Sequence, residues 1–190
     1  MVSAKRDSSS GGSGGRDEEE EKEGAGISNG YIYNMLKKRL KVRIFEDVFS
    51  ADTIPASLLQ QRGGGGGGGK VCIVNLSKAD DAGTHFIALH ILPEKIVIYD
   101  SLHLNLNLFS PALWKHLKRS KKSLVSGMKY PLQTVQSQFC GFYCIYFTLY
   151  LAKRQFANRQ GLVNFYKQEC EENDSIVIKN IRTLIKRNVK

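Results

Sequence analysis

The stretch of sequence that decides the fold is residues 133–144, QTVQSQFCGFYC. Within this stretch, polar, turn-prone sequence is followed by a long apolar and aromatic run, and Cys140 lies at the boundary between them. We predict a central, buried helix over residues 139–153, because this run is apolar almost all round. A thiol in the first turn of such a helix lies in the positive end of the helix dipole, which favours the nucleophilic thiolate. The segment therefore predicts a helix that presents a reactive cysteine.

The charge of the 190-residue chain is unevenly distributed. Residues 1–27 hold four basic and seven acidic side chains out of totals of 28 and 18, which leaves 24 basic and 11 acidic in residues 28–190, a net charge of +13. We predict a disordered, acidic, Ser/Gly-rich tail at 1–27 and one basic domain at 28–190. A domain this basic is drawn to polyanions such as DNA, and the alternative is that its cations only solubilise the surface.

The four cysteines are too few for a disulfide scaffold, and none has zinc-ligand spacing with a second cysteine or histidine pair. The sequence has no apolar N-terminal segment like a signal peptide, and the run at 139–152 is shorter than a membrane span. We therefore expect an intracellular protein, in the nucleus or cytoplasm, with free thiols and no membrane segment. It is expected to be a monomer that uses no cofactor and no metal.

Hydrophobic periodicity along the chain predicts an α+β fold, in which helices pack on a small mixed sheet. The expected strands are at 71–76, 84–92, 95–99 and 128–135, and the expected helices at 27–41, 111–119, 139–153, 162–170 and 176–189. Residues 45–55 are expected to form a loop that plugs one edge of the core. The seven glycines at 63–69 predict a flexible loop, and they lack the Lys-Ser/Thr ending of a phosphate-binding loop.

A histidine and an aspartate are expected to meet at one edge of the sheet. His85 begins the strand 84–92, and Asp100 follows the strand 95–99. If these strands pair as a hairpin, the start of one lies beside the end of the other, so the carboxylate would orient the imidazole. The alternative for Asp100 is an ordinary turn residue at the end of a strand.

The other three histidines are weaker candidates for a general base. His90 lies five residues after His85 on the same strand and so points to the opposite face. His103 and His116 lie in loop or basic surroundings, where a solvated side chain is the default.

An oxyanion formed at Cys140 would need hydrogen-bond donors. Gly141 would let the backbone pass close to a substrate and leave the Cys140 N–H free to face the oxyanion. Three glutamines precede the cysteine, Gln133, Gln136 and Gln138, and each is a candidate for the second donor or an ordinary loop residue. The residues alone do not choose among them.

Five motifs in this order resemble a known family. They are CIVN at 72–75, GTHFIA at 83–88, IYDSL at 98–102, Gln133, and CGFYC at 140–144. Together they resemble the adenovirus protease (adenain) group of cysteine peptidases and its relatives in Maverick/Polinton-type DNA elements. More distantly, they are similar to the proteases of ubiquitin-like proteins. The resemblance covers residues 28–152, and the block with the glutamine and the Cys-Gly pair is its most specific part.

The resemblance implies a papain-like fold of the ubiquitin-like-protease type and a role for each motif. It implies that Cys140 is the nucleophile, His85 the base and Asp100 the residue that orients it. Gln133 and the Cys140 backbone N–H would form the oxyanion hole, and the resemblance alone selects this glutamine over its neighbours. Phe86 stands where the family usually has Trp, and the acidic residue is Asp where adenovirus enzymes have Glu.

The implied activity is a cysteine endopeptidase that processes precursor proteins of a virus-like element. Enzymes of the adenovirus type are also stimulated by DNA, with which the basic domain is compatible. Three alternatives remain at this point: a protease that removes ubiquitin-like modifiers, an acetyltransferase that uses the same triad, and a basic nucleic-acid-binding domain without enzymatic activity.

Overall fold

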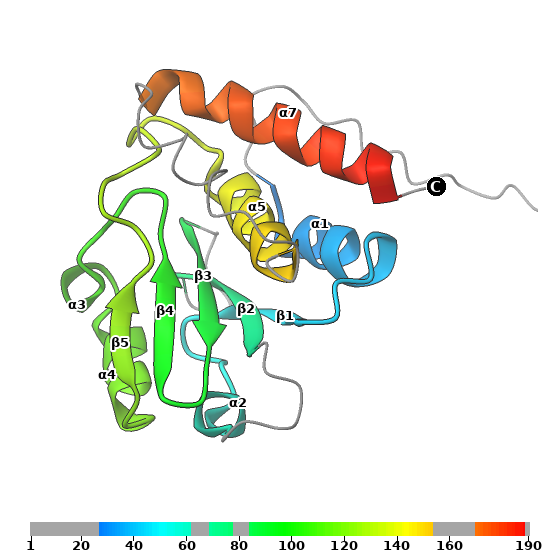
Figure 1. Cartoon of the computed structure of the whole chain (residues 1–190). Helices are drawn as coiled ribbons and strands as arrows, with labels where there is room; N and C mark the ends of the chain where they lie inside the picture. The colour runs from blue at the N-terminus through cyan, green and yellow to red at the C-terminus, as the bar shows by residue number, and fades with distance from the viewer. Residues whose placement is uncertain (1–26, 62–68, 78–83, 154–169, 189–190) are drawn as a thin grey trace, which may run out of the picture.

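The computed structural model describes residues 27–61, 69–77, 84–153 and 170–188 (Figure 1). The predicted tail at 1–27, the glycine loop at 63–69 and the helix at 162–170 lie outside these residues, apart from Ile27, Gly69 and Cys170. The described part is an α+β fold with a five-stranded mixed sheet packed by helices.

The strands of the sheet follow one another in chain order. They are β1 (Phe45–Ser50), β2 (Lys70–Asn75), β3 (Phe86–Ile91), β4 (Lys95–Tyr99) and β5 (Ser123–Ser126). The central strands β2, β3 and β4 are antiparallel, whereas each edge strand is parallel to its neighbour. The predicted hairpin of β3 and β4 is confirmed, with Ala88 opposite Tyr99 and Ile91 opposite Ile96.

Helices cover both faces of this sheet (Figure 1). They are α1 (Asn29–Tyr33), η1 (Asn34–Arg39, a π-helix), α2 (Ala56–Gln60), α3 (Leu106–Phe109), α4 (Pro111–Arg119), α5 (Cys140–Lys153) and α7 (Cys170–Asn188). One hydrophobic cluster joins α1, η1, α5 and α7 to one face of the sheet, and a second joins α2, α3 and α4 to the other. Every residue of β3 is therefore buried, which explains its nearly continuous apolar sequence.

The segment at 45–55 corrects the prediction of a loop, since its first six residues form the edge strand β1. The side chain of Phe45 is fully buried and lies opposite Val71 of β2. Glu46 and Asp47 follow it, and such charges are tolerated at the edge of a sheet. The partner of this strand is remote in sequence, so no hairpin signal marked it.

The strand predicted at 128–135 is also wrong, because the fifth strand is β5 and ends at Ser126. Gly127 then lies against the ring of Tyr99, where an added Cβ would come within 2.6 Å of a ring carbon. Pro131 lacks the N–H that a ladder needs. Residues 128–139 form the loop that leads from the sheet edge into α5.

The N-terminal helical region confirms the prediction for residues 27–41. Ser28 caps α1, because its side chain accepts a hydrogen bond of 3.1 Å from the Tyr31 N–H. Ile32 and Leu36 are fully buried beneath this region. The helix continues as η1 and is followed by Lys41, whose φ of +49° turns the chain toward β1.

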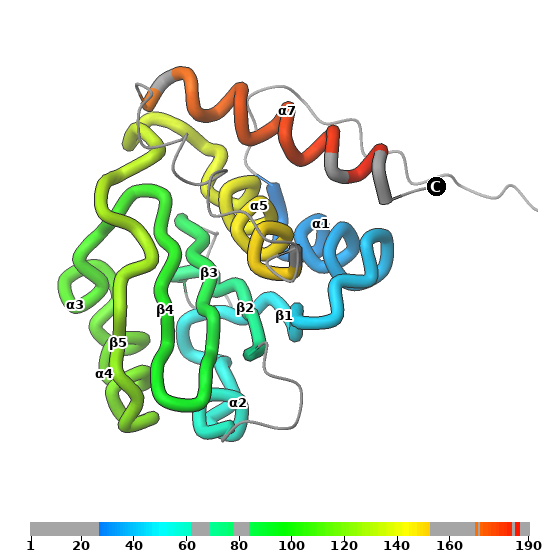
Figure 2. Tube along the Cα trace, in the orientation of Figure 1, coloured from blue at the N-terminus to red at the C-terminus, as the bar shows by residue number. Residues whose placement is uncertain are grey.

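The last described helix, α7, begins at Cys170 rather than at the predicted residue 176. It packs along α5 through its buried face, which includes Val177 and Ile181 (Figure 2). Three basic side chains, Lys179, Arg182 and Lys186, form an exposed stripe on this helix. Among the described residues, the protein has no helix that combines the length and apolar character needed to cross a membrane.

Candidate active site

A cleft of about 720 Å³ lies where the start of β3 meets the start of α5. Its walls come from five parts of the chain, and most of the residues that line it are polar. The lining residues are Ile27, Ser28, Asn29, Asn75, Thr84, His85, Phe86, Leu102, Val135, Gln136, Ser137, Gln138 and Cys140. Two of the predicted site residues, His85 and Cys140, therefore face one space.

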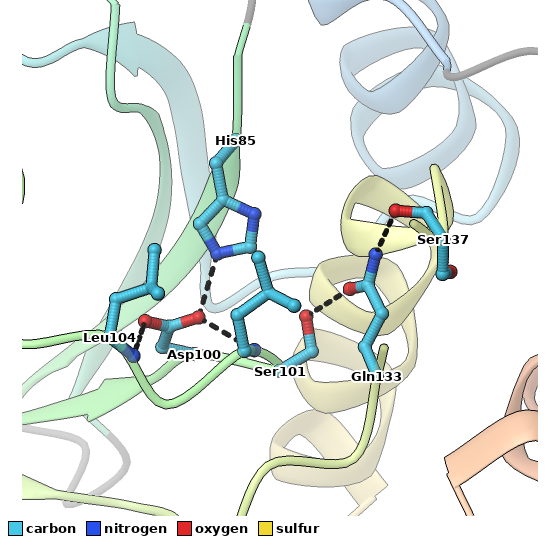
Figure 3. A network of polar contacts seen from close by, with 7 residues as sticks. His85, Asp100, Ser101, Leu104, Gln133 and Ser137 are labelled. Carbon is cyan, nitrogen blue, oxygen red and sulfur yellow. Dashed lines mark hydrogen bonds and ion pairs between the residues drawn. The ribbon is translucent and has the colours of Figure 1, made fainter. Parts of the chain in front are cut away.

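His85 is held at the entrance to β3 by the chain around it. The Leu76 N–H donates to the His85 carbonyl oxygen at 2.8 Å, and the Thr84 N–H donates to Ser77 Oγ at 3.1 Å. These bonds continue the pairing of β2 and β3 beyond the last ladder residues. His85 is only 5% exposed, and its Nε2 lies 2.7 Å from Asp100 Oδ1 (Figure 3). The predicted meeting of this histidine and aspartate is confirmed.

The carboxylate of Asp100 is fixed by backbone donors from the turn that follows it. Oδ1 accepts from the Leu102 N–H at 2.9 Å, and Oδ2 accepts from the Leu104 N–H at 2.8 Å (Figure 3). Asp100 is thus both a turn residue at the end of a strand and the partner of His85. Because both oxygens are engaged, the carboxylate holds the imidazole in one orientation.

The electrostatics of the cleft favour a protonated His85. Burial acts to lower the pKa of His85, but hydrogen bonds to Asp100 and Cys140 and the negative charges of both raise it from 6.5 to about 9. Since Nε2 faces Asp100, Nδ1 is the ring nitrogen left for the thiol. An imidazolium at neutral pH would place a positive charge beside the Cys140 side chain.

Cys140 is the first residue of α5 and is half-buried at the cleft. The first hydrogen bond of the helix runs from the Tyr143 N–H to the Phe139 carbonyl oxygen at 3.1 Å. The N–H of Cys140 consequently has no acceptor within the helix, as is general for a first turn. It is a backbone donor beside the thiol.

The remaining cysteines have surroundings unlike that of Cys140. Cys144 is 1% exposed, and burial, with the negative charges of Cys140 and Asp100, raises its pKa well above 9. Burial and the nearby Glu46 and Asp47 raise the pKa of the fully buried Cys72 to about 12. Cys170 Sγ lies 3.6 Å from the Pro131 carbonyl oxygen, away from the cleft lining. All four are free thiols.

The three candidate glutamines have different positions. Gln133 is 3% exposed, and its side-chain amide spans Ser101 and Ser137 (Figure 3). Gln136 and Gln138 are exposed residues of the cleft wall. Gln133 itself does not line the cleft, whereas residues 135–138, one of which accepts its hydrogen bond, do. Its amide nitrogen carries two hydrogens, and the Ser137 carbonyl uses one of them.

Gly141 has a packing role that the sequence did not indicate. A Cβ at this position would lie 2.6 Å from Ile27 Cγ1 and 3.3 Å from Ile32 Cδ1. The glycine therefore lets the N-terminal segment pack against the first turn of α5, and the predicted close approach of a substrate stays a prediction. Ile27 in turn forms part of the cleft wall.

Two features of the site had no signal in the sequence. Ser101 joins Asp100 to the loop before α5, since its carbonyl oxygen accepts from the N–H groups of Leu132 and Gln133 at 2.7 and 3.1 Å. The other side of that loop is held by α7, because Asn173 Nδ2 donates to the Leu132 carbonyl oxygen at 3.0 Å. Both contacts join residues more than 30 positions apart, so neither a local motif nor hydrophobic periodicity could have predicted them.

The histidines outside the site are accounted for in different ways. His103 is exposed, as expected, and has a φ of +53° in the turn after Asp100. His116 corrects the expectation of a solvated side chain, since it is half-buried and its Nε2 lies 2.9 Å from the Ile54 carbonyl oxygen. Among the described residues, no group of three or more His, Cys, Asp or Glu is arranged to hold a metal ion.

No protein-family model matches this chain, and no curated protein matches it either.

Proposed function

We propose that this protein is a cysteine peptidase in which Cys140 is the nucleophile, His85 the general base and acid, and Asp100 the residue that orients His85. The observation that carries the proposal is the position of the imidazole, with Nε2 2.7 Å from a fixed carboxylate and with Cys140 lining the same cleft. A thiolate paired with an imidazolium at a helix start is the arrangement that activates a cysteine nucleophile.

The mechanism follows from these positions. The Cys140 thiolate attacks the scissile carbonyl carbon, forming a C–S bond and an oxyanion. The oxyanion accepts from the Cys140 N–H and from the second amide hydrogen of Gln133 after a small adjustment of the 135–138 segment. The C–N bond then breaks as His85 gives its proton to the leaving amine. Water, deprotonated by His85, hydrolyses the thioester and restores the thiol.

The shape and chemistry of the cleft favour a polypeptide substrate. Its walls carry exposed amide side chains, among them Asn29 and Gln136, that would pair with an extended backbone. With the resemblance to adenovirus-type proteases, this favours a papain-like enzyme that processes precursor proteins of a virus-like element. Removal of a ubiquitin-like modifier uses the same chemistry, so the substrate must be distinguished by assay.

The proposal includes binding of DNA through the basic surface. The exposed stripe of Lys179, Arg182 and Lys186 on α7 belongs to a domain of net charge +13. If DNA binds there, peptidase activity or DNA affinity should fall steeply as salt rises. Activity and affinity that are both indifferent to salt would remove this part of the proposal.

The test of the proposal is the rate at which each cysteine reacts with chloroacetamide, followed by mass spectrometry of peptides. Cys140 is expected to react at least about 10-fold faster than Cys72, Cys144 and Cys170, because of the four it is the one that lines the cleft together with His85. His85→Ala should remove this advantage. Equal labelling of Cys140 and Cys170 in the wild type would overturn the proposal.

A second assay separates the substrates. Wild type and Cys140→Ala are incubated with precursor-type peptides and with a conjugate that ends in Gly-Gly. We expect peptide cleavage that the Cys140→Ala variant lacks. Cleavage of the conjugate alone would reassign the enzyme to ubiquitin-like modifiers, and consumption of acetyl-CoA with no cleavage would reassign it to acetyl transfer.

A further inference from the structure

A buried hydrogen-bond chain connects the acid of the site to the loop that leads to the nucleophile. Ser101 directly follows Asp100 and is 1% exposed. Its Oγ donates to Gln133 Oε1 at 2.6 Å, and Gln133 Nε2 donates to the Ser137 carbonyl oxygen at 2.7 Å (Figure 3). Ser137 stands three residues before Cys140.

The two ends of the Gln133 amide have different requirements. The Ser137 carbonyl can only accept a hydrogen bond, so the amide nitrogen must face it. The amide oxygen is then left in the interior, where an acceptor without a donor is unfavourable. In this structure the Ser101 hydroxyl is that donor. Without the Ser101 hydroxyl, the amide would lower its free energy by rotating so that its oxygen faces the cleft and water.

We propose that Ser101 is a positioning residue for the reaction, one that holds the Gln133 amide with its N–H donors toward the nucleophile segment. This inference rests on the proposed peptidase function, because it concerns the donor that would stabilise the oxyanion. Ser101 touches no substrate in this scheme and acts only through Gln133.

The backbone contacts of Ser101 make the side chain separable from the fold. Its carbonyl oxygen accepts from the Leu132 and Gln133 N–H groups whatever the side chain is. Removing the hydroxyl therefore leaves the loop tied to the strand end and changes one hydrogen bond. Ser101→Ala is expected to fold and to alter the amide alone.

The experiment is a double-mutant cycle of Ser101→Ala and Gln133→Ala, with kcat and KM measured on a cleaved peptide. Ser101→Ala is expected to lower kcat about 10-fold or more with KM within about 2-fold, since loss of an oxyanion donor costs about 10²–10³ in kcat. The double variant should be no slower than Gln133→Ala, because the hydroxyl acts only through that amide. Equal activity of Ser101→Ala and wild type, or losses that multiply in the double variant, would overturn the inference.

A matched control removes a similar hydroxyl elsewhere. Ser120 Oγ donates to the Leu117 carbonyl oxygen at 2.7 Å, and Ser120→Ala should leave kcat unchanged. The rate of Cys140 alkylation should also stay the same in Ser101→Ala, because the thiol and His85 are untouched. A drop in that rate would show general damage to the site and count against a role through Gln133.

A readout independent of turnover separates this inference from the proposed function. The side-chain NH₂ signals of Gln133, observed by NMR in the ¹⁵N-labelled full chain, should exchange slowly with water in the wild type and at least about 10-fold faster in Ser101→Ala. If the wild type cleaves no peptide, the proposed function fails while this measurement still tests the positioning. Unchanged exchange in Ser101→Ala would overturn the inference even in an active enzyme.

Discussion

The two ends of strand β3 each hold a buried histidine, and their surroundings differ. His85, just before the strand, is 5% exposed, and His90, near its end, is 7% exposed. The first pairs with the carboxylate of Asp100 and lines a cleft together with Cys140. The second is packed against Gly69, where an added Cβ would come within 2.7 Å of the His90 Nε2.

The difference between these ends lies in what the neighbouring chain supplies. At the start of β3, buried polar side chains gather from several segments: Asn75, Ser77, Asp100, Ser101 and Gln133. At the other end, Lys122 Nζ donates to the carbonyl oxygens of Gln61 and Leu92 at 2.9 and 2.7 Å, which ties the segments together there. Equal burial therefore does not mean equal surroundings, because the start of β3 opens on the cleft whereas the other end is tied by Lys122.

The largest expected effect comes from replacing the two histidines separately. His85→Ala should lower kcat/KM about 10⁴-fold, since the general base and acid is lost. His90→Gln should keep kcat/KM within about 3-fold, measured on the same peptide with folded protein verified by circular dichroism. Comparable losses in both variants would show that the two ends of β3 do not differ in function.

The site end of β3 was predictable to the extent that its contacts are local. His85 and Asp100 are 15 residues apart on one hairpin, so strand pairing alone brought them together. Cys140 was marked by the abrupt change from polar to apolar sequence at residue 139. These signals needed no knowledge of the rest of the fold.

The contacts that escaped prediction join remote segments. The edge strands β1 and β5 are parallel to their neighbours, and parallel pairing leaves no turn signal. The hydroxyl of Ser101 meets Gln133 across 32 residues, so the sequence could not distinguish this glutamine from Gln136 by physical argument. Burial now separates the two, as Gln133 is interior and Gln136 exposed.

A smaller effect is expected on stability as a function of pH. The pKa of His85 is raised from 6.5 to about 9 in the folded protein, so its contribution is complete below about pH 6.5 and is lost as pH rises through 9. A shift of this size corresponds to on the order of 3 kcal/mol. Urea unfolding of wild type and His85→Gln at pH 6 and pH 10 should show the wild-type advantage shrinking at the higher pH.

The quantity to compare is the difference in the free energy of unfolding between wild type and His85→Gln, because the contributions of titratable groups that both proteins share cancel in it. His90→Gln serves as the comparison from the other end of β3. A His85→Gln difference that stays constant between pH 6 and pH 10 would mean that the imidazole is not held as a cation by its neighbours.

The smallest effects are expected on the free energy of unfolding when either of two glycines, one near each end of β3, is replaced by alanine. Gly141→Ala would place a Cβ 2.6 Å from Ile27 Cγ1, and Gly69→Ala would place one 2.7 Å from His90 Nε2 at a φ of +67°. Each should lower the free energy of unfolding by about 1–3 kcal/mol, as overpacking does. Gly30→Ala is the control, since its Cβ would meet only Ser28 Oγ at 3.8 Å.

The two glycine variants should differ in the rate of Cys140 alkylation. Gly141→Ala displaces the first turn of α5 or the Ile27 wall of the cleft, so the rate should change. Gly69→Ala disturbs only the far end of β3 and should leave that rate as it is. Ile27→Ala combined with Gly141→Ala should recover part of the lost stability, because it removes the atom that the new Cβ meets. If Gly69→Ala instead slowed alkylation as much as Gly141→Ala, the strand would transmit strain between its ends and the two histidines would not be independent.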